Sequence, residues 1–77
     1  MSELREEEQN MVNGGANYVR GYSFKVGDRV TDRTKPENGV GIVTKNVGVC
    51  DRFYIDEVCF PNVNLTYNVY EFNLTSA

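Results

Sequence analysis

The sequence predicts an all-β fold, a small five-stranded barrel preceded by a flexible arm. From Phe24 onward, short apolar runs show the period-two alternation that is typical of half-buried strands. Turn residues separate these runs, and no stretch after Tyr22 has helical spacing. Seventy-seven residues allow a single domain. We therefore divide the chain into an N-terminal arm, residues 1–22, and a barrel, residues 23–77.

The arm is acidic and poor in apolar residues. It carries four glutamates against two arginines, and Asn13-Gly14-Gly15 interrupts any helical turn that starts near Ser2. An isolated helix of this length is marginal in water. We expect either a solvated arm or a helix that forms only on a partner.

Five strands are expected in the barrel, over residues 29–33, 41–45, 52–60, 65–70 and 72–74. Residues 35–39 form the first turn, because Pro36 fixes φ and Asn38-Gly39 accepts positive φ. Residues 46–51 are expected to be a loose connection, and a 3₁₀-like turn at Tyr70-Glu71 leads into the last strand.

Two glycines suit a narrow barrel. Gly27 permits a turn before the first strand, where Asp28 can accept hydrogen bonds from backbone amides. Gly41 within a strand indicates a close approach of other groups. The interior is then lined by Val30, Val43 and Phe60.

The register of the third strand has two solutions, because a slip of one residue exchanges its faces. Either Tyr54, Val58 and Phe60 point inward, or Phe53, Ile55 and Cys59 do. We favour the first set. Most of the aromatic residues are expected in the core, with one or two left at the surface as interface anchors: Phe53, Tyr54, Tyr67, Tyr70 and Phe72.

The segments FKVGDRV (residues 24–30) and GVGIV (residues 39–43) resemble the first hairpin of Tudor-like and KOW-like SH3-like barrels. The closest resemblance is to the C-terminal Tudor-like domain of UvrD-type repair helicases, with Val58-Cys59-Phe60 and Phe72-Asn73-Leu74 as the later elements. It implies a five-stranded SH3-like barrel and a protein partner in transcription or repair, RNA polymerase included. The chain departs from this pattern in a longer first loop, residues 34–38, and in Asp56 at a core-facing position.

The residue types argue against catalysis. The chain has no histidine and two cysteines, which removes the commonest general base and makes a poor metal site. Asp56 and Glu57 are adjacent in a strand, so their side chains point to opposite faces. We expect no enzymatic activity, no metal and no cofactor, and we expect free thiols at Cys50 and Cys59.

Function is predicted to be docking onto a protein partner in the cytoplasm, as an adaptor or an inhibitor of a nucleic-acid machine. The alternative is direct nucleic-acid binding, with Arg52 joining the basic first hairpin and with stacking on Tyr or Phe. A third use of the aromatic residues is a cage for a methylated side chain. The formal net charge of −3 favours a protein partner over phosphates. The predicted partner-binding residues are Arg29, Arg33, Lys35, Ile42, Lys45, Tyr67 and Tyr70.

Overall fold

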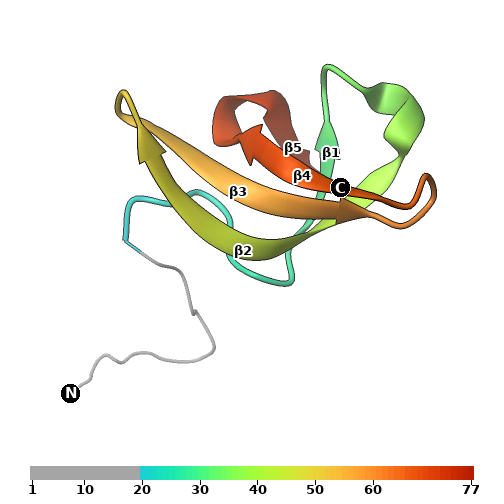
Figure 1. Cartoon of the computed structure of the whole chain (residues 1–77), viewed down its shortest axis with the longest axis horizontal. Helices are drawn as coiled ribbons and strands as arrows, with labels where there is room; N and C mark the ends of the chain where they lie inside the picture. Colours follow the sequence, from blue (N-terminus) through green and yellow to red (C-terminus); the bar gives the residue numbers. More distant parts are fainter. Residues whose placement is uncertain (1–19) are drawn as a thin grey trace.

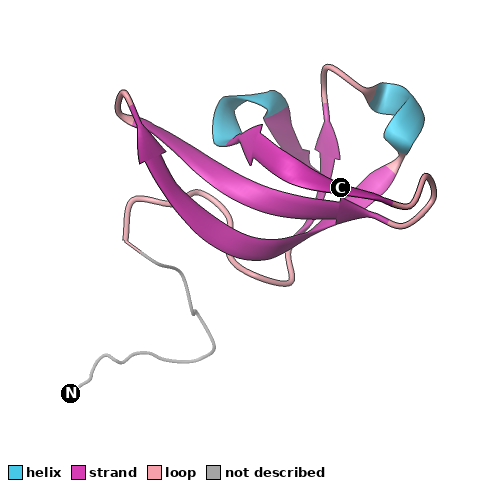
Figure 2. Ribbon diagram, viewed as in Figure 1, coloured by secondary structure: helices cyan, strands magenta, loops and turns pink. Residues whose placement is uncertain are grey.

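The computed structural model describes residues 20–77 and shows an all-β fold (Figures 1 and 2). Five antiparallel strands form one sheet in the order β4-β3-β2-β1-β5. The strands are β1 (Arg29–Asp32), β2 (Val40–Cys50), β3 (Phe53–Phe60), β4 (Leu65–Tyr70) and β5 (Leu74–Ser76). Two 3₁₀ turns, η1 (Pro36–Asn38) and η2 (Glu71–Asn73), are the helical elements of the described part. The hydrogen-bonded order starts at β4 and ends at β5, so closure into a barrel stays a prediction.

The hairpin of β2 and β3 is longer than the sequence predicted. The expected loop over residues 46–51 was wrong, because β2 continues to Cys50, which pairs with Phe53. Asp51 and Arg52 both adopt positive φ, 55° and 66°, as a two-residue hairpin turn requires. Register shifts follow Val43 and Asn46, so two irregularities bend β2 along its length (Figure 1).

The last strand is displaced from its predicted place. Phe72 and Asn73 lie in η2 rather than in a strand, and β5 starts at Leu74. Leu74 is buried and pairs with Asp32, so its burial fixes where the strand begins. The predicted strand over residues 65–70 is confirmed, and the first strand ends one residue earlier than expected.

The core is small and aliphatic apart from one phenylalanine: Val30, Val43, Val58, Phe60, Val69 and Leu74. Gly41 is buried, and a Cβ there would lie 2.6 Å from Val58 Cγ1 and 2.7 Å from Phe60 Cε1. The predicted close approach at this glycine is therefore confirmed. Gly27 has a φ of 98° and donates its N–H to the carbonyl of Val43, which anchors the turn before β1.

The favoured register of β3 is also confirmed. Val58 and Phe60 are fully buried, Tyr54 is half-buried, and Phe53 is exposed. Asp56 lies on the same inner face and is fully buried as well.

The expectation that most aromatic residues fill the core was wrong. Phe53, Tyr70 and Phe72 are exposed, whereas Tyr54 and Tyr67 are half-buried. The close contact at Gly41 explains this result, because a thin interior is filled by Phe60 and the aliphatic side chains.

Candidate functional site

Three exposed aromatic side chains form one cluster, which we call the aromatic surface (Phe53, Tyr70 and Phe72). The rings of Tyr70 and Phe72 are stacked, with centroids 5.1 Å apart. Phe53 meets Phe72 edge to face at 5.1 Å and Tyr70 at 6.3 Å. Phe53 begins β3, while Tyr70 ends β4 and Phe72 belongs to η2, so the end of the sheet brings the rings together.

A cation lies beside this surface. The guanidinium of Arg33, just after β1, donates a hydrogen bond of 2.8 Å to the backbone carbonyl of Phe72. Arg33 was a predicted partner-binding residue, and the structure places it beside Phe72, whose ring stacks on that of Tyr70. Phe53 and Phe72 were not among the predicted binding residues, because they were assigned to the core and the last strand.

A hollow lies near the other end of β3, away from the aromatic surface. Arg29 and Ile42 face each other on β1 and β2, and they line it with Val40, Pro61 and Asn62. Its volume is about 400 Å³. The structure thus separates the predicted residues Arg29 and Ile42 from the pair Arg33 and Tyr70.

The other predicted binding residues are scattered. Lys35 is exposed before η1, and Lys45 is exposed on β2 opposite Glu57. The hydroxyl of Tyr67 donates to Asp32 Oδ2 at 2.8 Å and accepts from Asn38 Nδ2 at 2.9 Å. These contacts give Tyr67 a structural role, and its use as an interface anchor stays a prediction that they do not favour.

A buried carboxyl group is the most unusual feature of the inner face. Asp56 is fully buried, and its Oδ1 accepts a hydrogen bond of 2.7 Å from Asn46 Nδ2. Its Oδ2 has no hydrogen-bond partner. Burial, and then the adjacent Glu71 carboxyl group, raise the pKa of Asp56 from 3.8 to about 7, against the opposing effect of Asn46.

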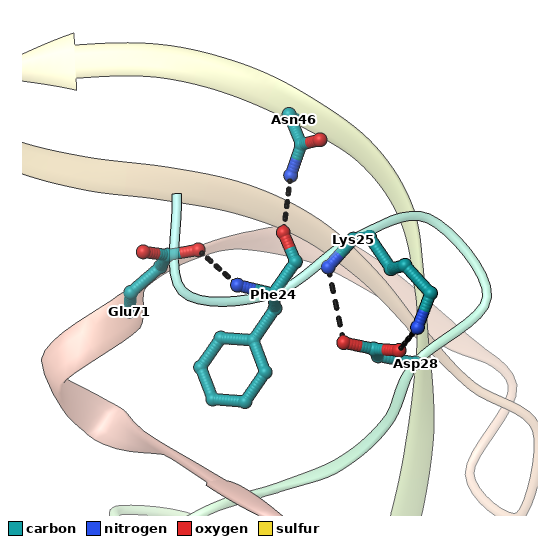
Figure 3. A network of polar contacts seen from close by, with 5 residues as sticks. All are labelled: Phe24, Lys25, Asp28, Asn46 and Glu71. Atoms are coloured by element: carbon teal, nitrogen blue, oxygen red, sulfur yellow. Dashed lines mark hydrogen bonds and ion pairs between the residues drawn. The ribbon is translucent and has the colours of Figure 1, made fainter. Parts of the chain in front are cut away.

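Asp56, Asn46 and Glu71 form one polar cluster, and this cluster also binds the segment before β1, which we call the strap (residues 22–24). Glu71 accepts hydrogen bonds from the backbone N–H groups of Ser23 at 3.0 Å and Phe24 at 3.2 Å. Asn46 Nδ2 donates to the carbonyl of Phe24 at 3.1 Å. Figure 3 shows Asn46 and Glu71 reaching the two sides of the same backbone.

This cluster was not predicted from the sequence. Asp56 was expected at a core-facing position, but the carboxyl group weighed against it was that of its neighbour Glu57, which lies on the other face. The true partners, Asn46 and Glu71, are distant in the sequence and come from β2 and η2. The available signal was a polar pair, Asn46 opposite Asp56, which the predicted loop at residues 46–51 concealed.

The boundary between arm and barrel stays a prediction. Residues 1–19, including the predicted helical turn near Ser2, lie outside the described residues. Tyr22, the last residue of the predicted arm, contacts Tyr54 with ring centroids 4.7 Å apart.

Within residues 20–77, no group of three or more Cys, Asp or Glu side chains is placed to hold a metal ion. Cys50 and Cys59 are free thiols. No helix in the described part is long and apolar enough to cross a membrane.

Comparison of the chain with protein-family models, curated proteins and solved structures found no match. The resemblance to Tudor-like barrels therefore stays a prediction, and function must be argued from the surfaces themselves.

Proposed function

We propose that the chain is a non-enzymatic interaction module, built as a small SH3-like barrel, that docks onto a protein partner through the aromatic surface. The partner we propose is a component of a transcription, repair or other nucleic-acid machine in the cytoplasm. The observation that carries the proposal is the mutual packing of Phe53, Tyr70 and Phe72 on the outside of the molecule.

Clustered, exposed aromatic residues are a known mark of protein interfaces. Large apolar side chains that stand alone on a surface need no explanation, but a contiguous patch does. Phe72 and Phe53 remain 52% and 46% exposed, so a partner would remove much apolar area from water. Their rings are already packed against one another, so binding orders few side chains.

Charge supports a protein over a polyanion. Residues 20–77 hold seven cationic and seven acidic side chains, so the module carries no positive excess for phosphates. Arg33, held beside Phe72, supplies a directional cation for an acidic residue of the partner.

The test uses the full chain as bait and a matched pair of variants. Proteins captured from the source cell are identified, purified and titrated against the wild type, Phe72→Ser and Leu65→Ser. Leu65 is the control, because it is 48% exposed and begins β4, whereas Tyr70 ends it. Loss of a central aromatic contact should weaken binding about tenfold or more. Equal affinity of the two variants for the partner would show that the aromatic surface is not part of the interface.

Direct nucleic-acid binding is the second candidate, and the position of Arg33 beside the rings favours it, since bases stack on aromatic residues next to cations. Fluorescence anisotropy with single-stranded DNA and RNA at low salt tests it. Under this alternative, Arg33→Glu combined with Lys35→Glu abolishes binding. Tight, salt-sensitive binding to an oligonucleotide without any protein partner would replace the first proposal with the second.

A further inference from the structure

We propose that Asp56 and Glu71 share one proton, that this proton fastens the strap to the sheet, and that its loss rearranges the aromatic surface. The inference rests on the proposed function only for its last step, because it names a control of that same surface.

The first step is the hydrogen-bond count at Asp56. The carboxyl group is fully buried, yet one oxygen has a single donor and the other has none. A buried carboxylate with so few donors is costly, whereas a protonated carboxyl group has a hydrogen to donate. Glu71 offers the acceptor, because both carboxyl groups adjoin the backbone of Phe24: Glu71 accepts its N–H, and Asp56 is joined to its carbonyl through Asn46 Nδ2.

The second step places the proton on Asp56 rather than on Glu71. Both Glu71 oxygens accept backbone N–H groups, from Ser23 and Phe24. Hydrogen bonds of this kind favour the ionised form of a carboxyl group. Two adjacent carboxyl groups do not ionise together readily, so the one with fewer donors keeps the proton.

The third step links the proton to the strap. Asn46 Nδ2 donates both to Asp56 Oδ1 and to the Phe24 carbonyl, and Glu71 holds the N–H of the same residue. The Phe24 side chain packs against the core. When the proton leaves for solvent, repulsion between the two carboxylates displaces Glu71, and the strap loses its two N–H acceptors.

The other charged groups near Asp56 act in the same direction or are neutralised. Asp28, in the turn before β1, adds negative charge that raises the pKa of Asp56. Its own charge is offset by Lys25, whose Nζ lies 2.8 Å from Asp28 Oδ1 (Figure 3). Tyr22 in the strap and Tyr54 on β3 contact each other on this side of the sheet. Val69, the neighbour of Asp56 on β4, carries no charge.

The last step reaches the aromatic surface through the chain itself. Glu71 stands between Tyr70 and Phe72, and η2 is the short turn that sets the stack of their rings. A displacement of Glu71 therefore moves the two residues that the proposed function places in the interface. Low pH fixes the strap and the stack, and high pH releases both.

The experiment is a titration of the full chain by nuclear magnetic resonance. The backbone amide signals of Ser23 and Phe24 and the ring signals of Phe72 are followed between pH 5 and pH 9. We expect all three to change with one common midpoint near the value of about 7 at which Asp56 loses its proton. Amide signals that do not change across that interval would overturn the proposal.

A variant at Asp56 separates the effect of losing the Asp56 proton from the titration of other groups. Asp56→Asn keeps the size of the side chain, and its amide group can donate to Glu71 as the protonated acid does. We expect the Ser23 and Phe24 signals of this variant to stay at their low-pH positions up to pH 9. A midpoint that persists in the variant would assign the transition to another group and overturn the inference. If the variant does not fold, the wild-type titration alone decides.

The two proposals fail in different ways. Should Phe72→Ser leave partner binding intact while the Ser23, Phe24 and Phe72 signals titrate together, the proposed function fails and the proton-dependent strap stands. If the Ser23 and Phe24 signals titrate together but the Phe72 ring does not, control of the aromatic surface is overturned and only the strap is linked to the proton.

Discussion

Two aspartates on the inner side of this sheet are buried almost equally, but their pKa values are shifted in opposite directions. Asp32 is 2% exposed and Asp56 is fully buried. Asp32 accepts hydrogen bonds from Thr34 N, Thr34 Oγ1 and Tyr67 Oη, at 2.9, 2.6 and 2.8 Å. Burial raises the pKa of Asp32, but these donors outweigh it and leave the pKa below its ordinary value.

Asp56 has one donor and a carboxyl neighbour instead, and its pKa is raised to about 7. The comparison teaches that burial alone does not set the charge of a carboxyl group; the number of donors and the charge of its neighbours decide it as well. Asp32 ties the turn at η1 to β4 at every pH above its low pKa. Asp56 stabilises the strap, through Asn46 and Glu71, only while it holds its proton.

The largest expected effect is the pH dependence of stability. The folded chain binds the Asp56 proton between pH 4 and 7, where the unfolded chain has released it. This contribution is complete below pH 4 and is lost as the pH rises through 7. From pH 5 to pH 8, the free energy of unfolding should fall by about 2.5 kcal/mol, since nearly two pH units separate pH 5 from the pKa of about 7 and each unit corresponds to about 1.4 kcal/mol. Urea denaturation at each pH measures it, and Asp56→Asn should flatten the profile.

A pair of isosteric variants sharpens the comparison at pH 8. Asp32→Asn replaces an acceptor oxygen by a donor facing Thr34 or Tyr67, so we expect a loss of about 2 kcal/mol. Asp56→Asn removes a buried charge next to Glu71, so the free energy of unfolding should rise by about 1 kcal/mol. Chemical denaturation of both variants tests the signs, and two losses of similar size would contradict the account.

Removal of a single donor from Asp32 should give an intermediate effect. Tyr67→Phe deletes the hydroxyl that joins Asp32 to Asn38 and should cost about 1 kcal/mol. It should also raise the pKa of Asp32, since one of the donors that lower it is gone. Tyr70→Phe is the control, because Tyr70 is exposed and lies outside this network. Equal unfolding midpoints for the two variants would show that the Tyr67 hydroxyl does not stabilise the fold.

The smallest effect on stability is expected at the aromatic surface. Phe72→Ser removes a side chain that is about half exposed, and surface substitutions usually change stability by about 0.5 kcal/mol or less. Thermal unfolding of this variant should therefore resemble that of the wild type, while its partner binding is weakened about tenfold or more. A large drop in the unfolding temperature would mean that the rings serve the fold rather than a partner.

The sequence predicted those parts of the fold that local patterns determine. Alternation located β1, β3 and β4, and the glycines at positions 27 and 41 identified a turn and a close contact. The length of β2 was missed, because the glycine- and asparagine-containing stretch from Asn46 onward reads as a loop although it pairs with β3.

The candidate site was predicted only in part. Tyr70 and Arg33 were named, but the exposure of Phe53 and Phe72 depends on how few large residues the core accepts. The bonds from Ser23 and Phe24 to Glu71 join residues 48 and 47 positions apart, beyond the reach of any local pattern. The charge of Asp56 follows from those distant neighbours, so no reading of its own strand could supply it.

The central claim is that Asp32 and Asp56 are ionised differently inside one sheet. The direct measurement follows the side-chain carboxyl carbon signals of both residues in a single pH titration of the full chain. The account predicts a midpoint near 7 for Asp56 and a midpoint below the ordinary aspartate value of 3.8 for Asp32. Two midpoints near 4 would contradict it.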